Sequence, residues 1–161
     1  MARTELDLKP VEFITIGTIG PKGRRIFHLQ AGYEGQIITF IIEKEQANAL
    51  GEALMSFIEE LDQRLNVKTD VEMAALDMDL REPIQPMFRI SQMGLAYDED
   101  EERVILIAEQ MSTSEDEDEN DIVRMWCTRE QMYALSIQAI DTVKAGRPGL
   151  RQNGRILYYW Q

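Results

Sequence analysis

Apolar residues in the first half of the chain gather into short segments separated by turn residues. This pattern predicts three strands, at residues 12–20, 24–31 and 36–42. Gly20-Pro21-Lys22-Gly23 forms the first turn, because proline presets one backbone dihedral and glycine tolerates positive φ. After the third strand, apolar residues recur every three or four positions, and this spacing predicts a helix over residues 45–65.

The second half of the chain has the same kinds of pattern. It predicts strands at residues 88–97, 103–111 and 121–127, followed by a helix over residues 129–144. Thr128 and Gln131 have the spacing of a capping box, in which each side chain hydrogen-bonds the backbone N–H of the other residue. We therefore expect this helix to begin directly after the third strand.

Several segments of the first half recur in outline in the second half. The matching pairs are residues 37–50 with 122–135, residues 13–16 with 88–91, and residues 25–29 with 103–107. Such self-similarity predicts an α+β fold of tandem β-β-β-α repeats, with a mostly antiparallel sheet and two main helices.

The predicted domain organisation follows from these repeats. Residues 1–146 form a single domain whose repeats cover about 12–66 and 88–146, joined by a linker at 67–87. Within the linker, residues 76–80 fit either a short helical turn or an edge strand. Residues 147–161 form a basic and aromatic C-terminal arm.

The central strands are apolar at consecutive positions. Residues 37–42 and 104–108 do not alternate polar with apolar side chains, as strands of a sheet open to water on one face should. We therefore expect both faces of the sheet to be covered, one of them by the two helices. The second repeat, the linker or another copy of the protein would cover the other face, and the last alternative motivates a homodimer hypothesis.

Composition and charge limit the classes of function. The formal net charge is −12, and eleven acidic residues lie in two runs, 98–102 and 115–121. An acidic surface repels phosphate backbones, so we expect no nucleic-acid partner. No segment has the ~20 apolar residues that span a bilayer, so we expect no membrane partner either. The single cysteine, Cys127, forms no intrachain disulfide and no zinc cluster, which favours a cytoplasmic location without metal or cofactor.

One turn carries the chemistry of an anion-binding site. Lys22, Arg24 and Arg25 lie among glycines that let a ligand approach the backbone, so a small anion or a phosphorylated metabolite is one hypothesis. His28, the only histidine, lies on the following strand and is the fourth candidate residue. A basic hairpin turn needs no ligand, however, and a lone histidine is more often structural than catalytic.

Two other features have structural interpretations that we prefer. Cys127 lies before a helix N-terminus, which can lower a thiol pKa, but its apolar neighbours favour burial as an inert residue. Glu45-Gln46 and Glu130-Gln131 recur at both predicted helix starts, where capping explains them. The acidic run 115–121 lacks the ligand spacing of an EF-hand, so only weak cation binding follows from it.

The C-terminal arm differs in composition from the rest of the chain. It contains Asn153-Gly154, a favoured hairpin turn, and ends in an aromatic cluster. This segment either docks on its own core or binds a partner. The candidate partner-binding residues are Arg151, Arg155, Tyr158, Tyr159 and Trp160.

Several motifs, in order, resemble an uncharacterised bacterial family, domain of unknown function 3090. They are the segments 13–20, 23–31 and 43–46, then Met93-Gly94-Leu95-Ala96-Tyr97-Asp98, and Ala145-Gly146-Arg147-Pro148. The resemblance covers most of residues 10–148. It implies a C-terminal zinc-knuckle-like segment, but no cysteine or histidine follows Pro148 here, so the zinc site is not carried over.

The sequence therefore predicts a non-catalytic binding or adaptor protein that associates with itself or with a protein partner. The alternative is a small enzyme or sensor for a phosphorylated metabolite that uses Lys22, Arg24 and Arg25.

Overall fold

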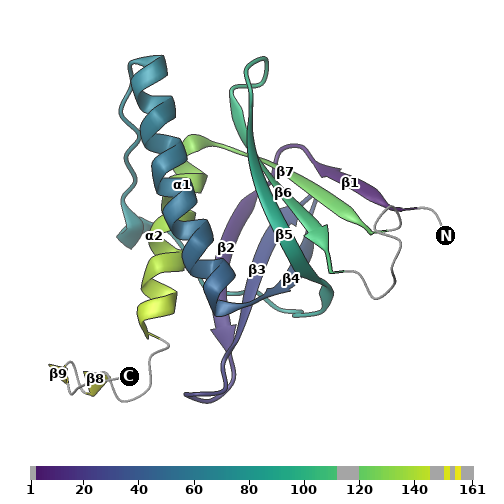
Figure 1. Ribbon diagram of the computed structural model, residues 1–161, viewed down its shortest axis with the longest axis vertical. Coiled ribbons are helices and arrows are strands. Elements are labelled where there is room, and N and C mark those ends of the chain that lie inside the picture. Colours follow the sequence, from purple (N-terminus) through teal and green to yellow (C-terminus); the bar gives the residue numbers. More distant parts are fainter. Residues whose placement is uncertain (1–2, 112–119, 146–150, 153–154, 157–161) are drawn as a thin grey trace.

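Two helices pack side by side on one face of a twisted sheet (Figure 1). The computed structural model describes residues 3–111, 120–145, 151–152 and 155–156. The first half contains β1 (Glu5–Leu8), β2 (Phe13–Ile19), β3 (Ile26–Tyr33), β4 (Gln36–Ile42) and α1 (Lys44–Leu65). The second half contains a 3₁₀ turn (Met73–Ala75), β5 (Pro86–Asp98), β6 (Arg103–Gln110), β7 (Ile122–Cys127) and α2 (Arg129–Ala145). Two short strands, β8 (Arg151–Gln152) and β9 (Arg155–Ile156), pair antiparallel with each other.

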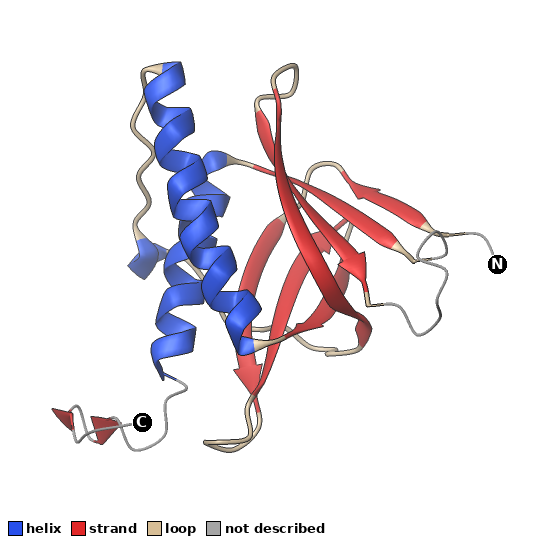
Figure 2. Cartoon of the chain, in the orientation of Figure 1, coloured by secondary structure: helices blue, strands red, loops and turns tan. Residues whose placement is uncertain are grey.

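The main sheet has seven strands in the order β1-β7-β6-β5-β4-β3-β2. Neighbouring strands are antiparallel except for two parallel pairs, β1 with β7 and β4 with β5. An α+β fold with a mostly antiparallel sheet and two main helices is thus confirmed (Figure 2). The tandem repeat stays a prediction.

The strand registers differ from one of the proposed correspondences between the halves. Phe13 lies opposite Gly32 in an antiparallel pair, whereas Phe88 lies opposite Phe40 in a parallel pair. Antiparallel pairing of β5 with β6 begins only at Ile90. Ile90, and not Phe88, is therefore the first residue of β5 that pairs with β6, whereas Phe13 is the first residue of β2 that pairs with β3.

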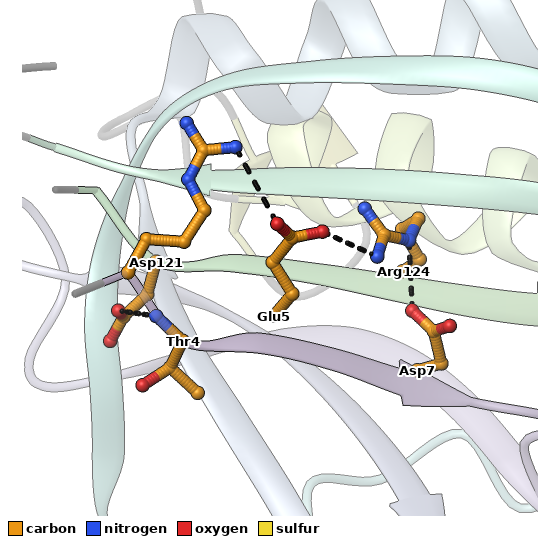
Figure 3. Close-up of polar contacts among 6 residues, drawn as sticks. Thr4, Glu5, Asp7, Asp121 and Arg124 are labelled. Carbon is orange, nitrogen blue, oxygen red and sulfur yellow. Dashed lines mark hydrogen bonds and ion pairs between the residues drawn. The ribbon is translucent and has the colours of Figure 1, made fainter. Parts of the chain in front are cut away.

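Strand β1 was not predicted from the sequence. It is short, and it is fixed to β7 by charged side chains: the Arg124 guanidinium contacts Glu5 Oε1 and Asp7 Oδ1, each at 2.8 Å (Figure 3). The backbone N–H of Thr4 also donates to Asp121 Oδ1 at 2.8 Å. The hydrogen bond between Arg124 and Glu5 lowers the pKa of Glu5 and raises that of Arg124.

The chain crosses from one edge of the sheet to the other between β1 and β2. These strands are consecutive in sequence but lie at opposite ends of the strand order. The Val11 N–H, just before β2, donates to the Trp126 carbonyl of β7 at 2.9 Å. The residue that leads into β2 therefore lies beside the end of β7.

The linker covers part of the sheet face that the helices leave open. Gln30 is fully buried on this face, and its side-chain amide pairs with the backbone of Arg81 in both directions, at 2.7 and 2.8 Å. The Thr15 hydroxyl donates to the Met78 carbonyl at 2.6 Å. We call residues 67–85 the strap. The linker was one of three alternatives considered for covering this face, and the strap is that linker. Within the strap, residues 76–80 form neither a helical turn nor a strand, and the Met78 carbonyl bonds a side chain of the sheet instead.

Both helix starts are capped as the sequence predicts. At α2, the Thr128 N–H donates to Gln131 Oε1 at 2.8 Å and the Gln131 N–H donates to Thr128 Oγ1 at 3.0 Å. At α1, the Glu43 N–H donates to Gln46 Oε1 at 2.7 Å. The glutamines at these starts are therefore occupied by helix capping.

Candidate functional site

A groove runs between α1 and the outer half of β5, and we call it the edge groove. Its first part, of about 310 Å³, is lined by Gln46, Ala49, Leu50 and Ala53 of α1, by residues 91–95 of β5 and by Leu106 of β6. A second part, of about 670 Å³, is lined by Phe57 and Arg64 of α1, by residues 96–100 and by Ile105. The two parts follow each other along α1 and β5.

The two ends of the edge groove are closed by side-chain contacts. Gln46 Nε2 donates to the carbonyls of Ile90 and Ser91, at 3.1 Å each. At the other end, the guanidinium of Arg64 lies 3.7 Å from Glu99 Oε1. From Gln46 to Arg64 the helix rises ~27 Å, and from Ser91 to Glu99 an extended strand covers ~26 Å. The two elements therefore run alongside each other over the same length.

Small residues leave space open between α1 and β5 between these ends. Ala49 is exposed, as is Ala53 one turn further along α1. Gly94 is exposed on β5, and a Cβ added there would meet nothing within 4 Å. A glycine within a strand often marks a place where another backbone approaches closely. The groove is therefore open where a chain would have to enter.

The backbone of β5 faces the groove with one of its edges unpaired. Strand β5 pairs with β4 only at Pro86, Phe88 and Arg89, because a bulge then moves the strand away. Among the described strands, none pairs with residues 92–98 on the side opposite β6. This stretch is a free sheet edge, which is a template for another strand.

The hydrogen-bond pattern identifies which residues point into the groove. The Gln110 N–H donates to the Asp121 carbonyl on the β7 side. In an antiparallel strand, the backbone N–H and C=O groups of successive residues point to opposite neighbouring strands. Those of Glu109 therefore point toward β5, and those of its partner Gln92 point toward β6. Counting on from Gln92, the N–H and C=O groups of Met93, Leu95 and Tyr97 point away from β6. These are the six backbone groups that an added strand would bond.

The far end of the groove is acidic. Residues 98–102 are all Asp or Glu, and they form the tip between β5 and β6. The Trp126 indole N–H donates to Asp98 Oδ2 at 2.9 Å, and this bond holds the pKa of Asp98 below its ordinary value. Asp98 therefore stays ionised, and this end of the groove favours a cationic side chain.

The basic turn predicted from the sequence lies elsewhere, between β2 and β3. The Arg24 N–H donates to the Pro21 carbonyl at 2.9 Å, and Gly23 takes positive φ of 88° in this turn. Lys22 and Arg24 are exposed at the turn. Only Arg25 lines a pocket, of about 470 Å³, together with Lys44 at the start of α1 and Arg89 of β5.

The Arg25 pocket contains an unsatisfied donor. Arg25 Nε is buried and has no hydrogen-bond partner among the described residues. Of the other two cations, Arg89 is engaged in an ion pair with Glu43. Lys44 and Arg89 were not predicted to lie here, because only the fold brings them close to the turn. The pocket can therefore offer an anion Arg25 and Lys44, against the charges of Glu43 and Glu45.

His28 lies apart from this pocket. It is 5% exposed, on the sheet face that the strap covers, and its Nδ1 lies 2.9 Å from the Ile26 carbonyl. Burial lowers its pKa, an effect that the bond to Ile26 partly opposes. The structure therefore does not bring His28 together with Lys22, Arg24 and Arg25.

The remaining candidates have separate positions. Cys127 is fully buried, and burial raises the pKa of its thiol, so it exists as an unreactive thiol. Of the candidate partner-binding residues, Arg151 and Arg155 belong to β8 and β9, and Tyr158, Tyr159 and Trp160 lie outside the described residues.

A metal-binding cluster and a membrane-spanning helix are both absent from the described residues. They contain no group of three or more His, Cys, Asp or Glu residues placed to hold a metal ion. No helix among them is long and apolar enough to cross a membrane. Residues 115–119 of the acidic run 115–121 lie outside the described residues, so cation binding by this run stays a prediction.

Comparison with known proteins supplies the family. Searches of curated proteins and of solved structures gave no match. A family described as "Protein of unknown function (DUF3090)" matches residues 6–152, which is most of the chain. The chain therefore belongs to the DUF3090 family.

Proposed function

We propose that this protein is a non-catalytic binding protein that takes up an extended polypeptide segment as an added strand in the edge groove. The observation that carries this proposal is the unpaired edge of β5 at Met93, Leu95 and Tyr97, three residues that also line the edge groove. Strand addition to a free edge is a recurrent mode of peptide recognition, in which backbone bonds give affinity and side-chain pockets give specificity.

The lining of the groove specifies the chemistry of the segment. Leu50 and Leu106 form a buried apolar floor in the first part, so apolar side chains are favoured there. Glu99 and Asp100 line the other part, so a lysine or arginine is favoured at that end of the segment. Helix α1 bounds the far side of the groove. This boundary favours a single strand from a partner protein over the sheet edge of a second copy, which would bring its own β6.

Burial of two potentially reactive side chains supports a non-catalytic role. His28 lies under the strap, and Cys127 is a fully buried thiol of raised pKa. Neither reaches the edge groove. We place the protein in the cytoplasm, as its cysteine content suggests.

We expect a tryptophan at position 53 to close the groove. Ala53 is exposed on α1, so Ala53→Trp can fold while its ring fills the space beside β5. Peptides of about nine residues, the length that matches the strand, are first selected from a displayed library with the full chain. Their affinity, measured by fluorescence anisotropy, should fall about tenfold or more in Ala53→Trp.

A matched control and a backbone readout make this test specific. Ser56→Trp adds the same ring to an exposed α1 position that does not line the groove, and should bind normally. In hydrogen exchange, a bound peptide should slow the amides of Met93, Leu95 and Tyr97. If no selected peptide is sensitive to Ala53→Trp, or if these amides exchange unchanged, the proposal is wrong.

A second candidate function rests on the unpartnered Nε of Arg25. In this alternative, the Arg25 pocket binds the phosphate of a small metabolite. Pyrophosphate or a sugar phosphate, several-fold above its Kd, should raise the melting temperature by about 3 °C. Arg25→Ala should abolish the increase, whereas Arg24→Ala, which alters an exposed neighbour outside the pocket, should retain it. An equal response in both variants would exclude a site at Arg25.

A further inference from the structure

Another cavity lies beneath the strap, on the side of the molecule where α2 and β2 begin. Its volume is about 410 Å³, and we call it the strap pocket. Phe13, Ile14, Val71, Leu76, Met78 and Ala134 provide its apolar lining. Concave, mainly apolar cavities with a few polar groups are the usual form of small-molecule sites.

The anchors of the strap explain why a cavity exists here. At one end, the Thr69 hydroxyl donates to Asp62 Oδ1 at 2.7 Å, and Arg129 donates to the same hydroxyl oxygen at 2.8 Å. At the other end, Met78 and Arg81 bond the side chains of the sheet. Between these anchors the strap arches over the pocket, and Leu76 remains 44% exposed.

The charges around the strap pocket are mostly negative. Four carboxylates line it, those of Glu12, Glu72, Asp77 and Glu130, against the single cation of Arg81. Within the described residues, the side chains of Glu72 and Glu130 have no hydrogen-bond or ion-pair partner. The pocket therefore attracts a positive charge at its rim.

An aromatic ring in the pocket already accommodates a cation. The guanidinium carbon of Arg81 lies 3.6 Å from the centroid of the Phe13 ring. The backbone of Arg81 is fixed by Gln30, so the arrangement is held by the fold. Because Arg81 occupies this face of the ring, the rim carboxylates are the groups that can receive a ligand's positive charge.

The geometry points to the strap pocket as a binding site for a small organic cation, an amine carried on an aromatic or aliphatic body. The body fills the apolar cavity, and the ammonium group lies among the rim carboxylates. This site is separate from the edge groove and does not depend on peptide binding there.

Three probes of similar shape test the charge requirement. They are tryptamine, its neutral counterpart tryptophol and the anionic indole-3-propionate, each titrated into the full chain by calorimetry. We expect tryptamine to bind about tenfold more tightly than tryptophol, and indole-3-propionate to bind least. Added salt should weaken only the tryptamine affinity.

Two variants locate the binding. Ala75→Trp places a ring in the pocket from an exposed strap position and should abolish tryptamine binding. Glu72→Gln with Glu130→Gln should weaken it about fivefold. Glu59→Gln with Glu60→Gln removes the same charge from exposed positions of α1 and should leave the affinity unchanged. Absence of tryptamine binding at millimolar concentration, equal binding of the three probes, or full binding by Ala75→Trp would overturn the proposal.

Discussion

Gln30→Leu is expected to lower the free energy of unfolding by about 3 kcal/mol, measured by urea denaturation. The side chain is fully buried, and it bonds the Arg81 N–H, the Arg81 carbonyl and the Thr39 hydroxyl. Leucine is one atom shorter and apolar, so it satisfies none of these groups. Three polar groups of the strap and the sheet would therefore be left buried without partners.

The variant should also release the strap before the rest of the fold unfolds. Limited proteolysis should cleave it near residues 76–85, while α1 and α2 stay protected. Gln92→Leu is the matched control, because Gln92 is exposed and bonds only Glu109, at 2.7 Å. A loss below about 1 kcal/mol in Gln30→Leu, or equal losses in the two variants, would show that Gln30 does not anchor the strap.

Much of the sheet could be predicted from periodicity, because burial acts on each strand locally. The ends of β2 and β4 lie within one residue of the predicted ends. Strand β1 has an alternating pattern at Leu6 and Leu8, but four residues are too few to distinguish it from a loop. The parallel pairing of β4 with β5 was beyond prediction, because it depends on strands that are separated by α1 and the strap.

For the candidate sites, prediction from the sequence was limited in a different way. Arg25 was among the predicted residues, but its pocket depends on Lys44 and Arg89, which only the tertiary structure brings to the turn. The edge groove was not predicted, because a free edge is a property of strand pairing and not of composition. Gly94, within a predicted strand, was the one available signal.

Each proposed site is bounded by an element that was predicted only to link the repeats or to cover the sheet. The strap forms the roof of the strap pocket, and α1 forms one wall of the edge groove. Their positions are set by a few specific contacts, among them Gln30 with Arg81 and Gly51 with α2. Substitutions at these contacts should therefore change binding as well as stability.

Gly51→Leu is expected to lower the free energy of unfolding by about 3 kcal/mol, measured by urea denaturation. Gly51 is buried where α1 crosses α2. A Cβ added there would lie 2.8 Å from Ile140 Cγ1 and 3.2 Å from the Ser136 carbonyl oxygen. Ile140 can rotate, but the backbone of α2 cannot yield locally, so a leucine must force the helices apart. The loss should exceed the gain of about 1 kcal/mol in helix propensity that follows from replacing glycine.

Smaller and matched substitutions separate packing from propensity. Gly51→Ala should be close to neutral, because the gain in propensity offsets the contact with Ile140. Ser56→Leu adds the same side chain to an exposed position of α1 and should not destabilise the protein. Because α1 also carries Ala49 and Ala53, its displacement by Gly51→Leu should narrow the edge groove and weaken peptide binding in the folded fraction. If Gly51→Leu is as stable as Ser56→Leu, then the separation of the helices is not fixed at Gly51, and the width of the groove must be set elsewhere.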